Sequence, residues 1–204
     1  MKLGKVPQDG KPHTYCLRCR RETVRWARQN GQLVYTCTGC GHVGPRALII
    51  DPAINWWLGQ DGEYWHEAAG VFLRNARGEF LFFERTKFPF GLTVPAGHVD
   101  RGEAHLRTAR RELFEETGVR LPERAFKHVS TDNVRGDSCR RGSDAHRWHA
   151  YAAKLRVGAT IKVSSDEGTR PVWLGLDQAL QRDITFVTRY VITRYARQIV
   201  AAAA

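Results

Sequence analysis

Apolar and polar positions along the chain divide it into a strand-rich middle and a helical C-terminal end. An apolar run at 68–73 and a strand-like segment at 79–84 flank the turn-forming segment Asn75-Ala76-Arg77-Gly78, and together they predict a hairpin. Shorter strand-like segments follow at 91–95, 126–130, 147–155 and 172–174. These runs predict a sheet that contributes most of the core.

Two other segments carry helical spacing. In residues 104–116, Leu106, Ala109 and Leu113 form one apolar stripe, which would pack a helix onto the sheet. Apolar residues also recur near helical spacing over 184–200, with arginines beside them. This second helix is expected to cover the core or a dimer partner, with a membrane-surface helix as the weaker alternative. The mixed order of strands and helices predicts an α/β (α+β) fold.

The first predicted helix carries a cluster of carboxylates. Glu112, Glu115 and Glu116 fall within an arc of roughly 100° on a helix. Like charges at this spacing weaken a helix by a few tenths of a kcal/mol per pair, so a compensating cation is expected. Mg²⁺ prefers oxygen ligands, commonly one or two carboxylates together with substrate phosphates. The alternative is a solvated acidic helix face.

Residues 97–119 fill every specified position of the pattern G-x5-E-x7-R-E-L-x-E-E-x-G-V. The segment resembles the Nudix box, the signature of Mg-dependent hydrolases that cleave nucleoside diphosphates linked to another moiety. The resemblance covers about residues 63–180 and implies an α/β/α sandwich. It also makes a merely solvated acidic face a poor explanation of the three glutamates.

The resemblance implies roles for individual residues. Glu112, Glu115 and Glu116 would hold Mg²⁺ or Mn²⁺ together with the Ala96 carbonyl, and Arg111 would orient the carboxylates. Metal-activated water would then attack phosphorus. Glu103 lies opposite Glu112 on an ideal helix, so a structural role at the helix start is expected.

A further ligand or base often comes from a loop beyond the box in this family. Glu167, in Ser164-Ser165-Asp166-Glu167-Gly168, is the preferred candidate here. An ordinary acidic turn is the alternative. The expected catalytic set is therefore Glu115, Glu116, Arg111 and Glu167.

Four of the five cysteines form two Cys-x-x-Cys pairs, Cys16/Cys19 and Cys37/Cys40, separated by 17 residues. Such pairs joined by a hairpin supply the four thiolates of a structural zinc site, and Asn30-Gly31 is a strong turn signal between them. Two disulfides are the competing interpretation, which a cytosolic chain disfavours. The expected organisation is a zinc ribbon at 1–46, a linker at 47–62, a Nudix domain at 63–183 and a C-terminal helix at 184–204. In the linker, Trp56 and Trp57 are expected to pack the two domains together, with base stacking as the alternative.

Charge is concentrated at the two ends of the 204-residue chain. The net charge is +11, and residues 1–46 hold nine Lys/Arg against two Asp/Glu. This asymmetry favours an acidic partner, either a polyphosphate substrate or nucleic acid bound by the ribbon's arginines and aromatic rings. A scaffolding or dimerising ribbon is the alternative. The N-terminus lacks an apolar signal segment and no run approaches 18 apolar residues, so a cytoplasmic protein without membrane contact is expected.

Two features are left without a firm role. Cys139 has no obvious partner in the sequence, and a nucleophilic role is not favoured. The Arg/Gly-rich segment 135–147 is polar and long, so a solvated loop is expected there, with a mobile phosphate-binding flap as the alternative.

A zinc ribbon before a Nudix domain resembles the layout of NADH pyrophosphatases. Their selectivity string, Ser-Gln-Pro-Trp-Pro-Phe-Pro, is absent, since residues 120–136 contain one proline, Pro122, and no tryptophan. The motifs typical of coenzyme A and many ADP-ribose pyrophosphatases are also absent. The sequence therefore predicts hydrolysis of a nucleoside diphosphate derivative or a nucleoside triphosphate. The alternatives are a non-catalytic nucleotide sensor with a nucleic-acid-binding ribbon and an enzyme acting on RNA 5′ ends.

Overall fold

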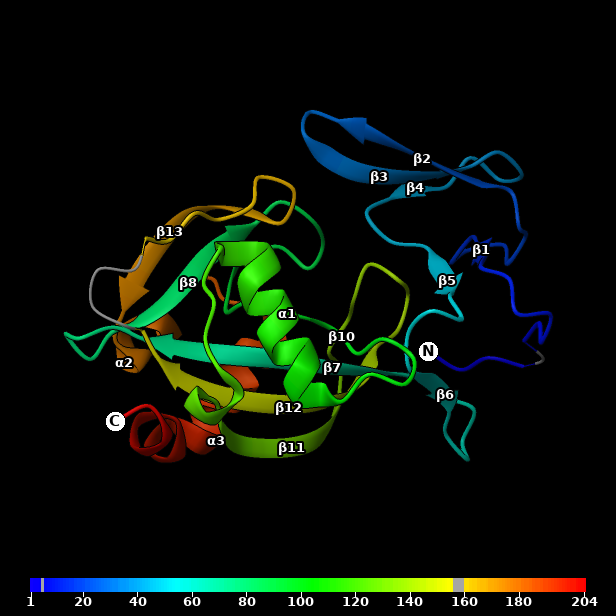
Figure 1. Ribbon diagram of the computed structural model, residues 1–204. Helices are drawn as coiled ribbons and strands as arrows, with labels where there is room; N and C mark the ends of the chain where they lie inside the picture. The colour runs from blue at the N-terminus through cyan, green and yellow to red at the C-terminus, as the bar shows by residue number, and fades with distance from the viewer. Residues whose placement is uncertain (5, 156–159) are drawn as a thin grey trace.

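The computed structural model describes residues 1–4, 6–155 and 160–204. A mixed sheet in its centre has the strand order β11-β12-β7-β8-β13 (Figure 1). These strands are β11 (Lys127–Arg135), β12 (Ala145–Lys154), β7 (Tyr64–Arg74), β8 (Phe80–Arg85) and β13 (Gly168–Leu174). Strands β7 and β12 run parallel, while the other neighbours are antiparallel. Three short strands extend the sheet: β6 (Trp56–Leu58) and β10 (Ala96–His98) pair with β7, and β9 (Leu92–Thr93) pairs with β8.

Helices cover both faces of this sheet, because alternate residues of β7 serve two separate cores. Ala69, Val71 and Leu73 contribute to the core beneath α1 (His105–Thr117). Ala68 and Phe72 contribute to the opposite core, which includes residues of α2 (Leu176–Leu180) and α3 (Phe186–Ala202). Both faces of β7 are therefore apolar over residues 68–73, as the continuous apolar run there predicts. The α/β/α sandwich is confirmed (Figure 1).

Local signals in the sequence match the ends of several elements. The Asn75 side chain accepts the backbone N–H groups of Arg77 and Glu79, which closes the turn between β7 and β8. Helix α1 ends where Gly118 adopts a φ of 74° and donates its N–H to the Phe114 carbonyl, a common glycine C-cap. Helix α3 starts two residues later than expected, because the backbone of Thr185 still bonds to Leu92.

Some elements were not predicted from the pattern. Strand β11 continues through polar residues to Arg135, although only 126–130 was expected to be extended. Its side chains are mostly exposed because it lies at the edge of the sheet, so it lacks a long apolar run. Helix α2 spans five residues and η1 (Glu123–Ala125) spans three, which is too short for a recognisable helical period.

The N-terminal part contains two small sheets. Strands β2 (Val24–Gln29), β3 (Gln32–Cys37) and β4 (Val43–Gly44) form one of them, and β1 (His13–Tyr15) pairs with β5 (Leu48–Ile50) in the other. Asn30 and Gly31 connect β2 to β3 with φ angles of 51° and 78°, as the predicted two-residue hairpin turn requires. Tyr35 is buried, whereas Trp26 is 69% exposed and does not cover a core.

Residues 47–62, expected to act as a linker, include strands β5 and β6. Because β6 pairs with β7, this segment is bonded to the central sheet. Trp56 packs edge-on against Tyr64, and Trp57 stacks on Trp65 with 5.9 Å between ring centroids. Both tryptophans therefore pack against the first strand of the sandwich.

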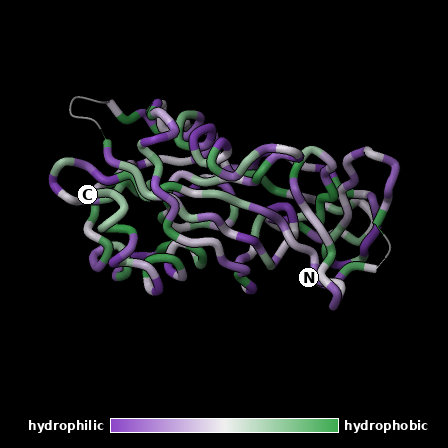
Figure 2. The backbone as a smooth tube through the Cα atoms, turned by 60° about the horizontal axis from the view of Figure 1, so that its bottom comes forward, coloured by the Kyte–Doolittle hydropathy of each residue, from purple (hydrophilic) through white to green (hydrophobic). Residues whose placement is uncertain are grey.

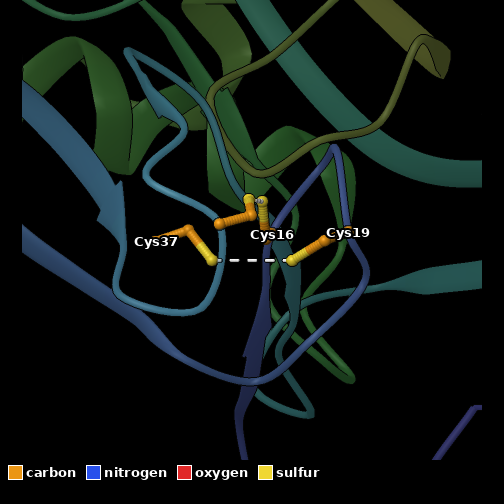
Figure 3. A group of neighbouring side chains, drawn as sticks. Cys16, Cys19 and Cys37 are labelled. Carbon is orange, nitrogen blue, oxygen red and sulfur yellow. Dashed lines mark hydrogen bonds between the residues drawn. The ribbon is translucent and has the colours of Figure 1, made fainter.

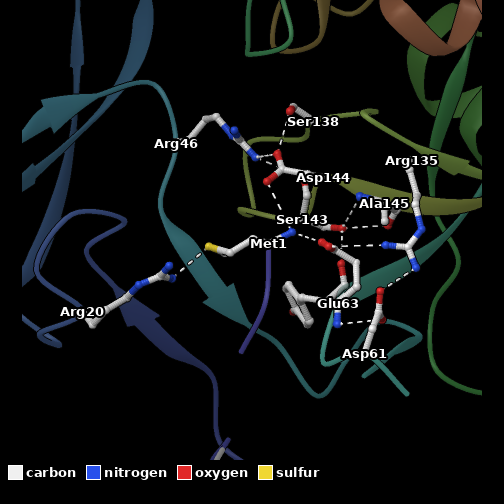
Figure 4. A network of polar contacts seen from close by, with 11 residues as sticks. Met1, Arg20, Arg46, Asp61, Glu63, Arg135, Ser138, Ser143, Asp144 and Ala145 are labelled. Atoms are coloured by element: carbon white, nitrogen blue, oxygen red, sulfur yellow. Dashed lines mark hydrogen bonds and ion pairs between the residues drawn. The ribbon is translucent and has the colours of Figure 1, made fainter. Parts of the chain in front are cut away.

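A polar network joins the N-terminal part to the segment before β12 (Figure 4). Arg46 donates to the backbone carbonyls of Cys139 and Ser143 and lies 2.6 Å from the Asp144 carboxylate. The amino group of Met1 forms an ion pair with Glu63. Segment 135–147 was expected to be a solvated loop, and that expectation is wrong, because its members include Asp137, Cys139, Ser143 and His146, all of them buried.

The two termini lie towards opposite ends of the molecule, and apolar segments run along the strands between them (Figure 2). Within the described part of the chain, no helix is both long enough and apolar enough to cross a membrane.

Candidate active site

Helix α1 presents the three box glutamates in three different environments. Glu116 is 2% exposed, and its Oε2 accepts the backbone N–H of Ala96 at 2.8 Å. Glu112 is also largely covered, whereas the side chain of Glu115 is 54% exposed. Ala96 thus meets the cluster through its N–H, and the predicted ligation by its carbonyl stays a prediction.

Burial dominates the electrostatics of the two inner carboxylates. It raises the pKa of Glu116 well above the ordinary value, and the nearby Glu112 adds to this effect. Burial also raises the pKa of Glu112 to about 7, although the Arg111 guanidinium opposes that shift. Two shielded groups of like charge would be relieved by a cation, and hard carboxylate oxygens are the donors that Mg²⁺ prefers. The residues present therefore fit a divalent hard cation.

Arg111 connects the start of α1 to the glutamates. Its Nη1 donates to Glu112 at 2.6 Å and to Glu115 at 3.2 Å. Its Nη2 donates to Glu103 at 2.9 Å and to the His98 carbonyl at 3.1 Å. Such a fork holds two glutamate side chains in fixed directions. The expected orienting role of Arg111 agrees with these contacts.

Glu103 lies just before α1 and holds the first turn of that helix. Its carboxylate accepts the Thr108 hydroxyl at 2.7 Å as well as the Arg111 guanidinium. These contacts match the structural role predicted for Glu103.

Glu167 comes from the loop before β13, where the Ser164 N–H donates to the Glu116 carbonyl at 2.9 Å. The charge of Glu167 raises the pKa of both Glu112 and Glu116. Lys87 donates from Nζ to Glu167 Oε1 at 2.6 Å. Lys87 was not predicted from the sequence, and neither was Arg85, whose charge lowers the pKa of Glu116. The signal that could have found them is the pair of basic residues, at 85 and 87, that follows the strand-like segment 79–84.

A cavity of about 70 Å³ lies beside the box glycine. Its wall includes Ala96 and Gly97 from β10, Arg85 from β8 and Trp148 from β12. Phe90 and Phe186 each follow a residue of this wall in the sequence, and their side chains are exposed, at 40% and 50%. The wall also includes His98, Asp137, Cys139 and His146, so polar as well as apolar side chains line the cavity.

The four paired cysteines converge in the N-terminal part, where the ligand atoms lie within 4.8 Å of one another. Figure 3 shows Cys16, Cys19 and Cys37 around this point. The Sγ atoms are 3.7 Å apart between Cys16 and Cys40 and 3.6 Å apart between Cys19 and Cys37. A disulfide needs about 2.05 Å, whereas tetrahedral zinc with sulfur ligands at about 2.3 Å separates them by about 3.8 Å. The cluster therefore fits zinc and excludes the alternative of two disulfides in this structure.

Comparison with known proteins assigns the sandwich and its site to one family. The NUDIX domain family model matches residues 64–195. The asymmetrical bis(5′-nucleosyl)-tetraphosphatases of Rattus norvegicus and Mus musculus are 31% and 30% identical to this chain over 107 residues. Each of those matches covers 52% of this chain and 71% of the relative.

Solved structures show the same fold at lower identity. A C. elegans Ap4A hydrolase in a binary complex has a TM-score of 0.54 and 21% identity, covering 67% of this chain and 98% of that one. The NUDIX domain of Shewanella oneidensis NrtR, complexed with ADP ribose, has a TM-score of 0.55 and 20% identity, covering 66% of this chain and 87% of that one.

Proposed function

Because this chain belongs to the Nudix family and is a hydrolase of phosphoric anhydride bonds, we propose that it cleaves the polyphosphate bridge of dinucleoside polyphosphates, with nucleoside triphosphates as lesser substrates. The observation that carries the proposal is the carboxylate cluster of Glu112, Glu115 and Glu116, held by Arg111 and by the Ala96 N–H. A degenerate cluster would instead favour the nucleotide sensor.

Glu112, Glu115 and Glu116 would hold Mg²⁺, or Mn²⁺ in its place. When bound, such an ion polarises a phosphoryl oxygen and lowers the pKa of water. The buried position of Glu116 supports its assignment as a ligand, because a buried carboxylate without a cation would take up a proton instead.

The chain's own residues then position the reaction. Arg111 keeps Glu112 and Glu115 pointing in one direction, and the Ala96 N–H fixes the carboxylate of Glu116. Glu167 is assigned to accept a proton from the attacking water, and Lys87 holds its carboxylate in place. Arg85 and Lys87 add positive charge beside the acidic cluster, which favours binding of a polyphosphate.

The choice of a dinucleoside polyphosphate rests on two supports. Relatives that are 30–31% identical are named as asymmetrical bis(5′-nucleosyl)-tetraphosphatases, and they align over 107 residues. The exposed rings of Phe90 and Phe186 also offer surfaces on which a nucleobase can stack. The absent selectivity strings argue against NADH and coenzyme A as preferred substrates.

A steady-state comparison tests the assignment, with diadenosine tetraphosphate, ATP, ADP-ribose, NADH and 5′-capped RNA as substrates and Mg²⁺ present or removed. Diadenosine tetraphosphate should give the highest kcat/KM and should yield ATP and AMP. Activity should disappear with chelation and return with Mg²⁺. A kcat/KM for NADH ten times higher than for every other substrate would overturn the substrate assignment. Tight nucleotide binding without cleavage of any substrate would replace the enzyme with a sensor.

A further inference from the structure

A second group of metal-ligating side chains lies outside the carboxylate cluster. It consists of His66 on β7, His98 at the end of β10, Cys139 in the segment between β11 and β12, and His146 on β12. One ligand atom from each residue lies within 4.8 Å of all the others. His66, Cys139 and His146 are buried, and His98 is half-buried at the wall of the 70 Å³ cavity. The proposed hydrolysis uses none of these four side chains.

Two of the distances between ligand atoms match the edges of a metal-centred tetrahedron. His66 Nδ1 lies 3.1 Å from His98 Nε2 and 3.6 Å from Cys139 Sγ. Zinc bonds of about 2.05 Å to nitrogen and about 2.3 Å to sulfur give a nitrogen–nitrogen edge of about 3.3 Å and a nitrogen–sulfur edge of about 3.6 Å. In the four-cysteine cluster, the sulfur–sulfur distances of 3.7 and 3.6 Å likewise agree with the edge of about 3.8 Å expected around zinc.

The surroundings of the group resemble those of a metal site. His146 Nδ1 lies 3.0 Å from the carboxylate of the buried Asp137, so the other ring nitrogen is left for the cluster. A ligating histidine commonly gives its second ring nitrogen to such a carboxylate, which fixes the ring.

Ordinary core packing explains the group poorly. Buried polar side chains are normally hydrogen-bonded, because an unpaired one costs roughly 1–3 kcal/mol. His66 Nδ1 faces both His98 Nε2 and Cys139 Sγ, and one ring nitrogen, with either a single proton or a single lone pair, cannot fully hydrogen-bond to both. Three imidazoles and one thiol directed at one another cannot all be satisfied by exchanging protons. A cation at their centre would satisfy the ligand atoms together.

We propose that His66, His98, Cys139 and His146 bind a second structural zinc ion, distinct from the ribbon zinc and from the catalytic Mg²⁺. Nitrogen and sulfur donors select zinc over Mg²⁺, which prefers oxygen. Four protein ligands close the coordination sphere, so this ion is structural.

The position of the site gives it a definite structural task. It joins β7, β10 and β12 to the segment that carries Arg140 and Arg141. Arg140 donates to the Tyr35 hydroxyl in the ribbon, and Arg141 pairs with Asp51 beside β5. The backbone carbonyl of His98 accepts Arg111 of the acidic cluster. The ion would therefore connect strands β7, β10 and β12 both to the N-terminal part and to the acidic cluster.

Metal analysis of the full-length protein, prepared without chelator and without added metal, tests the proposal. Mass spectrometric elemental analysis should find two zinc ions per chain, one for each cluster. X-ray absorption at the zinc edge should give on average about 2.5 sulfur and about 1.5 nitrogen ligands per zinc, because the two sites supply five sulfurs and three nitrogens. One zinc per chain with four sulfur ligands would overturn the second site.

Matched variants separate the two ions. Cys139→Ser and His146→Gln should each lower the zinc content to one and leave an all-sulfur spectrum. Cys40→Ser should also leave one zinc, but with one sulfur and three nitrogens around it. Circular dichroism checks that each variant folds. If the Cys139 and His146 variants do not fold, the X-ray absorption spectrum of the wild type and the zinc content of Cys40→Ser still test the second site. Two zinc ions retained in a folded Cys139→Ser protein, or a zinc-free Cys40→Ser protein, would overturn the assignment.

Discussion

The carboxylate of Glu112 lies directly over the Cα of Gly97, in the space that a β-carbon would occupy. Strand β10 and helix α1 can therefore approach each other only where the strand carries glycine. The first residue of the box thus has a steric function: it leaves room for a carboxylate at the site.

Replacing Gly97 by alanine should displace Glu112 without unfolding the sandwich. Because a shift of about 1 Å in a positioned group can cost 10²-fold in rate, we expect kcat/KM to fall on the order of 10²-fold. Gly175→Ala is the control, since a β-carbon there would make only ordinary contacts. Unchanged kinetics in a folded Gly97→Ala protein would contradict the steric role.

The acidic cluster could be predicted from the sequence because its members are close together along one helix. Glu112, Glu115 and Glu116 share a face as soon as the helix forms. By contrast, His66, His98, Cys139 and His146 come from separate elements, and no local spacing connects them. Their convergence depends on β7 pairing with both β10 and β12, which is a tertiary relationship.

Contacts that hold the active-site residues in place were also missed where they join distant parts of the sequence. Lys87 meets Glu167 across 80 positions of sequence, so the sequence pattern did not indicate their ion pair. The burial of segment 135–147 was missed because its composition is polar. Its Arg140 and Arg141 contact Tyr35 and Asp51 in the N-terminal part, and its Cys139 and His146 are buried.

Glu116→Gln should abolish most activity while preserving the fold. The amide oxygen can still accept the Ala96 N–H, but the charge that would hold Mg²⁺ is lost. We expect a fall in kcat of about 10²-fold or more, by comparison with the removal of other positioned electrostatic groups. Mg²⁺ should raise the Tm of the wild type and have a much smaller effect on the variant. A fully active variant would remove Glu116 from the ligand set.

Glu167→Gln should lower kcat with little change in KM, because it removes a proton acceptor and keeps the side-chain volume. A fall of about 10²-fold or more is expected for a general base. Asp166→Asn is a matched control in the same loop, since that side chain is 73% exposed and pairs with Arg28 in the ribbon. Equal effects of the two substitutions would assign Glu167 to loop structure instead.

Asp51 should make the fold sensitive to acid. Burial raises the pKa of Asp51, but the Ala53 N–H and the Arg141 guanidinium together outweigh it and hold that pKa below its ordinary value of 3.8. A depressed carboxyl pKa contributes stability that is present above the unfolded-state pKa and lost as pH falls through the folded-state pKa. The free energy of unfolding, from urea titrations between pH 6 and pH 2.5, should therefore fall less steeply below about pH 4 in Asp51→Asn than in the wild type. Identical slopes would show that the pair does not contribute.

Phe186 and Phe90 should bind the nucleobase of the substrate. Both rings are exposed, and each adjoins in sequence a residue of the cavity wall, Thr185 or Pro89. Base–aromatic stacking contributes about 1–3 kcal/mol per base, so alanine at either position should raise KM for diadenosine tetraphosphate about tenfold with kcat nearly unchanged. Phe114→Ala is the control, because that exposed ring lies on α1 and carries Arg120 on its face. Inorganic tripolyphosphate has no base. If the Phe186 and Phe90 variants lost as much affinity for it as for diadenosine tetraphosphate, the two rings would support the fold and would not bind the base.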